Sequence, residues 1–251
     1  MALKWSLRRQ LLYYAVASII SVFLSIIVWQ ALFSTEATCF DKKQNGGETG
    51  ADCGGPCALL CQDTARAPVV LWSRAFKVGQ RSYTAAAYVQ NQNQSAGARA
   101  VSYSFQLFDD KNLLIVEKTG VIDLPPVRTI AVVEPNIDVG NRVVARTQFS
   151  FSTTASWSRV QADAVVPVKV ADQLLSRDGS RLSATLVNDT LEDSPRVMMV
   201  GVLFDQYGTA RAASKSTINR IPRKSSQPIV LTWSGGVSDI VQAEITILPS
   251  F

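Results

Sequence analysis

The residues of this chain that could carry metal or redox chemistry lie in one short stretch, CFDKKQNGGETGADCGGPCALLC. It holds all four cysteines of the 251-residue sequence: Cys39, Cys53, Cys57 and Cys61. Cysteines in such a group can bind zinc, exchange electrons as a redox pair, or form two disulfides. Which of these applies depends on the compartment, and the residues before the stretch indicate the compartment.

Composition excludes several classes of protein. The chain has no histidine, so serine-histidine and cysteine-histidine nucleophiles are absent. Its formal net charge is +5, with basic and acidic residues interleaved. No basic stripe or known binding motif predicts a nucleic-acid partner.

A membrane segment is predicted over residues 11–33, LLYYAVASIISVFLSIIVWQALF, which contains no Lys, Arg, Asp or Glu. At 1.5 Å per helical residue, about 20 such residues cross a hydrocarbon core of about 30 Å. The segment is therefore long enough to span a bilayer.

The flanking residues predict the direction of this segment. Basic residues precede it, and the next one follows only at Lys42. Because positive charge stays cytoplasmic, residues 1–10 are predicted inside and everything after the segment outside the plasma membrane. The predicted anchoring residues are the basic ones and an interfacial tryptophan: Lys4, Arg8, Arg9 and Trp29.

A cleaved signal peptide is the competing interpretation, and a buried helix is a third. Signal peptides have apolar regions of about 7–15 residues, which is shorter than this one. Thr35-Glu36-Ala37 is also a poor cleavage site. Both a retained anchor and a cleaved signal export the rest of the chain.

Four cysteines in an exported segment favour two disulfides, with three pairings open. The polar segment around them cannot bury a core, so crosslinks are the expected source of its order. A zinc knuckle needs reduced thiolates, and its usual Cys-x2-4-Cys pairs are only loosely matched by Cys53, Cys57 and Cys61, each separated from the next by three residues. A redox pair lacks the Cys-x-x-Cys spacing.

Calcium is a further hypothesis for the same stretch. Hard oxygen ligands occur at short spacing around two glycines: Asp41, Asn45, Glu48 and Asp52. The spacing does not follow the EF-hand pattern, and these residues are also ordinary turn formers. No other cofactor is predicted.

The stretch NGGETGADCGGPC resembles a short cysteine-rich module of extracellular and cell-surface proteins, which often lies beside β-sandwich domains. Lys42 stands where this module has Gly, and the last two cysteines are separated by three residues instead of two. The resemblance implies a surface location and disulfides, without a catalytic activity.

After Cys61, short β-branched and aromatic runs separated by turn residues predict strands. Two regions share landmarks: a strand ending at Asn91 or Asn188, a polar turn, and a strand ending in Leu-Phe-Asp at Asp109 or Asp205. The two Leu-Phe-Asp motifs lie 96 residues apart. Two copies of one β unit explain this order.

The alternation of VSYSFQL predicts a half-buried strand with four residues on one face: Val101, Tyr103, Phe105 and Leu107. Asp109 and Asp205 are predicted to be turn residues whose carboxylates accept backbone N–H bonds. A catalytic pair is the alternative, but the repeat gives both residues the same local role.

The sequence FQLFD at residues 105–109 resembles FxLYD-type and related immunoglobulin-like β-sandwich domains of bacterial envelope proteins, with Phe in place of Tyr. The motif VLFD at 202–205 matches without the leading aromatic residue. The resemblance implies two sandwiches and interaction roles. The predicted organisation continues with a cysteine-rich spacer at 34–67, one sandwich at 68–160 and a second at 161–251.

The fold class predicted is mainly β, with one transmembrane helix, a disulfide-rich segment and two tandem immunoglobulin-like β-sandwich domains. The connector around Ser158 to Pro167 is short, so the sandwiches are expected to pack closely. The function expected is a membrane-anchored, extracytoplasmic, non-enzymatic protein that presents its sandwiches to a protein or glycan partner or scaffolds an envelope assembly. The alternative is an exported carboxylate-based hydrolase or a calcium-dependent ligand-binding protein.

Overall fold

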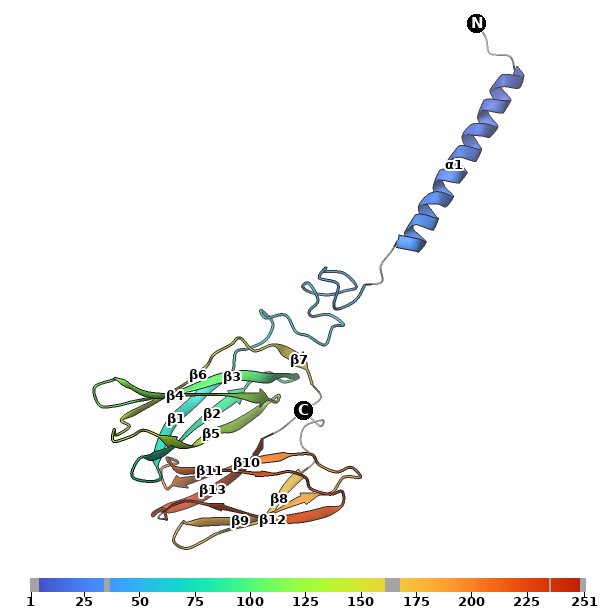
Figure 1. Ribbon diagram of the computed structural model, residues 1–251. Coiled ribbons are helices and arrows are strands. Elements are labelled where there is room, and N and C mark those ends of the chain that lie inside the picture. The colour runs from blue at the N-terminus through green and yellow to red at the C-terminus, as the bar shows by residue number, and fades with distance from the viewer. Residues whose placement is uncertain (1–4, 34–36, 161–167, 235, 249–251) are drawn as a thin grey trace. The chain divides into compact units, whose positions relative to one another are not determined.

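The computed structural model describes residues 5–33, 37–160, 168–234 and 236–248. Contacts divide the chain into two units, Met1–Asp52 and Cys53–Phe251. The first unit holds the helix α1 (Trp5–Phe33), followed by turns (Figure 1). The predicted anchor residue Lys4, the first two residues of the poor cleavage site and the predicted start of the second sandwich lie outside the described residues.

Helix α1 is long and apolar enough to cross a membrane. Its segment Arg8–Gln30 has 23 residues with a mean hydropathy of 2.4, and none of that window is buried. Leucine, isoleucine, valine and phenylalanine surround it on every side, as in a helix that contacts lipid. A signal sequence near the N-terminus can meet the same criteria of length and hydropathy, so the helix is an apolar N-terminal segment of either kind.

The first sandwich is built from two antiparallel sheets, with strand orders β1-β2-β5 and β4-β3-β6. A short strand, β7, also pairs with β3. The strands are β1 (Val69–Lys77), β2 (Ser82–Asn91), β3 (Ala96–Phe108), β4 (Leu114–Leu124), β5 (Arg128–Asp138), β6 (Arg146–Phe151) and β7 (Trp157–Arg159).

The second sandwich has the same strand order, with sheets β8-β9-β12 and β11-β10-β13. Each of its six strands corresponds to one of the first six of the other sandwich. They are β8 (Val168–Leu175), β9 (Arg181–Asn188), β10 (Val197–Asp205), β11 (Ala210–Ile218), β12 (Ser225–Thr232) and β13 (Ile240–Leu248). The predicted fold class, mainly β with two immunoglobulin-like sandwiches, is confirmed.

The alternating strand predicted at residues 101–107 lies in β3 and has the expected face. Val101, Tyr103, Phe105 and Leu107 are all at most 3% exposed, and they pack with Phe149 of the neighbouring β6. Period-two alternation therefore determined which side chains of this strand enter the core.

Two central strands, β2 and β10, do not alternate, because both of their faces are covered. Met199 and Leu203 of β10 belong to the core of the second sandwich. Val200 and Val202 pack instead with the buried residues of the first sandwich. The sheet β1-β2-β5 thus lies against β11-β10-β13, and the four sheets stack in layers (Figure 1).

Specific contacts join the two sandwiches, as the short connector predicts. The Tyr88 hydroxyl donates to Oε2 of Glu244 at 2.9 Å. The Tyr88 ring packs edge-on against the Phe204 ring, with 5.9 Å between the ring centroids. Lys215 donates to the carbonyl of Val133 at 3.3 Å. Burial, with the hydrogen bond to Glu244, raises the pKa of Tyr88, so the hydroxyl keeps its proton and donates.

Candidate functional site

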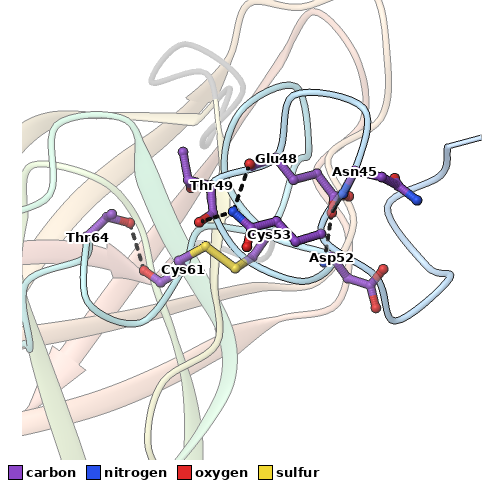
Figure 2. Close-up of a disulfide and its surroundings, with 8 residues drawn as sticks. Asn45, Glu48, Thr49, Asp52, Cys53, Cys61 and Thr64 are labelled. Atoms are coloured by element: carbon purple, nitrogen blue, oxygen red, sulfur yellow. Dashed lines mark hydrogen bonds between the residues drawn. A yellow bond between two sulfur atoms is a disulfide. The ribbon is translucent and has the colours of Figure 1, made fainter.

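The cysteine-rich segment is disulfide-bonded. All four cysteines are bonded and none is free, which confirms the prediction of disulfides. Cys53 pairs with Cys61, as Figure 2 shows, and this bond selects one of the three pairings that four cysteines allow. No thiolate is left for the zinc or redox alternatives.

Residues 53–62 lie against the end of the first sandwich. Leu59 forms an antiparallel bridge with Ser158. The N–H of Leu60 donates to the Trp157 carbonyl at 2.8 Å, and the N–H of Arg159 donates to the Ala58 carbonyl at 2.8 Å. This part of the segment therefore adds to the strand β7, where sequence alone predicts a separate spacer.

Replacing both Cys53 and Cys61 with serine should loosen this added strand. Opening a loop of this size removes about 2.5 kcal/mol of stabilisation in the chain-entropy model. Amide hydrogen exchange of Leu60 and Arg159 should accelerate, while the amide of Phe105 in the core should keep its rate. Unchanged exchange at Leu60 and Arg159 would show that backbone pairing alone holds the segment.

The oxygen-rich loop uses its carboxylates to hold its own backbone. Both carboxylate oxygens of Asp52 accept from the N–H of Lys42 at 3.0 Å. Oε2 of Glu48 accepts from the N–H of Asp52 at 3.1 Å and from the N–H of Asn45 at 3.5 Å (Figure 2). Asp41 accepts from Asn45 Nδ2 at 2.7 Å. The amide of Asn45 is the main cause that lowers the pKa of Asp41.

Two further features of this loop bear on its chemistry. Lys42, where the resembling module has Gly, adopts a φ of 60°, a left-handed conformation that glycine reaches without strain. Asn45 Oδ1 is a buried acceptor without a partner in the described part of the chain.

Calcium binding stays a prediction, and an unfolding midpoint that does not move in millimolar calcium would contradict it.

Three of the four predicted anchor residues lie along α1. The side chains of Arg8 and Arg9 are exposed at its N-terminal end, and Trp29 is 65% exposed near its other end. The helix thus carries charge at one end and an aromatic ring near the other, the arrangement typical of interfacial anchoring.

Asp109 and Asp205 are turn residues, as predicted. Oδ1 of Asp109 accepts from the N–H groups of Lys111 and Leu113 at 3.0 and 2.8 Å. Oδ1 of Asp205 accepts from Tyr207 and Thr209, both at 2.9 Å. The two carboxylates do the same local work at the ends of corresponding strands. The Arg142 guanidinium also forms an ion pair with Asp109, and its hydrogen bond is the main cause that lowers the pKa of Asp109.

An open groove of about 580 Å³ lies where the two sandwiches meet. Residues 73–78 of β1 and the turn after it line one side, and the start of β11 with Trp233 lines the other. Its polar side chains include Arg74, Lys77 and Arg211. Sequence reasoning missed this site because its residues come from two domains and follow no motif.

Comparisons with known proteins add little to these observations. No family model matches the chain, and no curated protein matches it either. Among solved structures, a red sea bream transglutaminase is similar over 73% of this chain and 29% of its own, at 11% identity and a TM-score of 0.24. A structure named pT26-6p is similar over 72% of this chain and 61% of its own, at 8% identity and a TM-score of 0.19. The chain thus spans less than two thirds of either protein, and TM-scores this low carry no argument about function.

Proposed function

We propose that this chain is a single-pass membrane protein that holds two β-sandwiches outside the cytoplasm, where they bind a protein or glycan partner or scaffold an envelope assembly. The observation that carries the proposal is the set of disulfide-bonded cysteines in a chain with one apolar N-terminal helix. Disulfides form and persist in oxidising compartments, and the helix supplies a means of export or anchoring.

The way the polar groups are used supports the proposal of a non-enzymatic role. The carboxylates of Asp109 and Asp205 are engaged by turn N–H groups, and those of Glu48 and Asp52 hold a loop. Histidine is absent from the sequence. Binding by strands and loops needs none of the proton-transfer groups that catalysis requires.

A family assignment is part of the proposal: the cysteine-rich stretch is a surface module, and the two sandwiches are FxLYD-type domains that arose by duplication. Their common strand order supports the duplication. So do Asn91 and Asn188, whose side-chain amides each donate to three backbone carbonyls at matching positions.

Reporter fusions to the full chain test the topology. A reporter that is active only outside the cytoplasm should work when it is fused after residue 251 and fail when it is fused before residue 1. Changing Lys4, Arg8 and Arg9 together to Glu should weaken this orientation, because the positive charges set it. The matched control changes three exposed basic residues of the second sandwich instead. An active N-terminal reporter on the unchanged chain would refute the topology.

An intact-mass measurement separates anchor from signal. A retained helix gives the mass of the full chain, whereas cleavage removes the N-terminal segment. Crosslinking of the full chain in its membrane, followed by identification of what it captures, then tests for a partner. Detection of a mature form without α1 would turn the proposed anchored protein into a secreted one.

A further inference from the structure

The groove between the sandwiches is bordered by the edges of two sheets. Among the described strands, β1 pairs only with β2 and β11 pairs only with β10, so each is the last strand of its sheet. Consecutive residues of β1, from Ser73 through Lys77, line the groove. Because alternate side chains of a strand point to opposite faces, a run of consecutive residues means that the strand's edge borders it.

The edge of β1 offers unpaired backbone groups along this run. A strand at the end of a sheet leaves alternate N–H and C=O groups without a strand partner. Over residues 73–77 the described part of the chain shows no backbone bond to a strand other than β2. The Ser73 hydroxyl donates to the Thr147 carbonyl at 3.0 Å, so β6 approaches this edge through a side-chain contact and does not pair with it as a strand.

The charges in this groove are all of one sign. Arg74, Lys77 and Arg211 are exposed, and none of their side chains has a hydrogen bond or ion pair to another residue that the structure describes. The described residues that line the groove include no aspartate or glutamate. Like charges gathered in a concave site raise the local concentration of anions and speed their association.

A second hollow shares Gly236 and Val237 with the groove and carries acidic side chains. It contains Asp178 and Asp239. The hydroxyls of Ser176 and Ser180, with the N–H of Ser180, lower the pKa of Asp178 to about 2, so it is ionised at neutral pH. Arg177 lines the same hollow, so its charges are mixed, whereas the charged side chains described beside β1 and β11 are positive.

We infer that this groove binds an extended acidic peptide segment, which adds as a strand to the edge of β1 while its carboxylates contact Arg74, Lys77 and Arg211. Strand addition uses main-chain hydrogen bonds for affinity and side-chain contacts for specificity. Six residues of β1 and its following turn give a contact of about 20 Å, enough for a peptide of about six residues. The inference deepens the proposed function, on which it rests, by naming the chemistry of the partner.

The test is fluorescence anisotropy of a labelled octapeptide of alternating Glu and Val, titrated with the full chain in lipid nanodiscs. Saturable binding that weakens as salt rises is expected, because exposed charges are screened. The same peptide with Lys in place of Glu should not bind. Methylating alternate backbone nitrogens of the Glu peptide should abolish binding, since it removes the donors of an added strand while the charges stay.

Paired charge-reversal variants locate the site. Changing Lys77 and Arg211 to Glu should weaken binding at least about tenfold, because two attractive contacts become repulsive. The control changes Arg128 and Arg196 to Glu, which alters charge equally. Arg128 lies opposite Asn91 at the C-terminal end of β2, whereas Lys77 lies opposite Tyr83 near the N-terminal end of β2. The Arg128 substitution is therefore far from the groove along the strand. Equal loss in both variants would show attraction to overall charge and overturn the site.

Three outcomes contradict the inference, and each is distinct from failure of the proposed topology. No binding of the Glu peptide would remove the site. Undiminished binding of the methylated peptide would remove strand addition. Equal binding of a uronic-acid oligosaccharide and the peptide would replace the peptide by a general anion. The reporter fusions are unaffected by any of these results, so a groove that fails leaves the topology standing.

Discussion

Replacing Asn188 with aspartate is expected to destabilise the second sandwich by about 3 kcal/mol or more, because it buries a carboxylate without a cation. Asn188 is 0% exposed. Its Nδ2 donates to the carbonyls of Glu192, Ile221 and Pro222 at 2.9, 3.1 and 3.2 Å. Its Oδ1 accepts from the N–H of Thr190 at 3.1 Å. One side chain thus ties two loops to the end of β9.

Aspartate has the same shape but replaces both amide hydrogens with a second acceptor oxygen. Three carbonyls would then face an oxygen instead of a donor, and the new carboxylate would be buried without a cation. A buried charge left without a partner costs about 3–5 kcal/mol. Urea unfolding followed by tryptophan fluorescence measures the loss.

Asn219 supplies the control for this substitution. It is exposed, so Asn219→Asp makes the same chemical change with an expected effect within about 0.5 kcal/mol. Asn91→Asp should behave like Asn188→Asp, because the Asn91 amide donates to three carbonyls in the first sandwich. A loss below about 1 kcal/mol for both buried variants would refute the role of these residues.

Much of the fold follows from local sequence pattern. The alternation over Val101 to Leu107 predicts a half-buried strand, and the structure buries that face. The Leu-Phe-Asp motifs predict turns, and Asp109 and Asp205 accept turn N–H groups there. Such features depend on a few neighbouring residues, so a single sequence is sufficient to find them.

The packing of one sandwich on the other was harder to predict. The run VMMVGVLF in β10 is apolar on both faces, which indicates a strand covered on both sides. Sequence does not say what covers the second face, because the covering residues in β2 and β5 lie more than 60 positions away along the chain. The groove has the same origin, since Lys77 and Arg211 meet only when the sandwiches pack.

The role of the paired asparagines was visible in the sequence only as a landmark. Asn91 and Asn188 each follow an apolar strand before a polar turn, which is compatible with an exposed turn residue. Their amides instead bond carbonyls 33 and 34 residues further along the chain. Long-range partners of this kind leave no local signal.

Replacing Val202 with aspartate is expected to separate the sandwiches or unfold both, at a cost of about 3–5 kcal/mol at pH 7. Val202 is 0% exposed and packs with the buried residues of the first sandwich. It lies opposite Glu244 in the β10–β13 register, so the new carboxylate would be buried beside a second one. Burial and this neighbour both raise the pKa of an aspartate.

The sign of the pH dependence distinguishes a buried carboxylate from a simple packing defect. A folded-state pKa raised above the unfolded value of about 3.9 means that the penalty is absent below pH 4 and grows as pH rises. The stability difference between Val202→Asp and the unchanged chain should therefore shrink toward pH 4. Val241→Asp is the control, because Val241 is 67% exposed in the neighbouring strand. If both variants lose the same stability at pH 7, the two inner sheets do not pack through this face, and the groove that their contact forms does not exist.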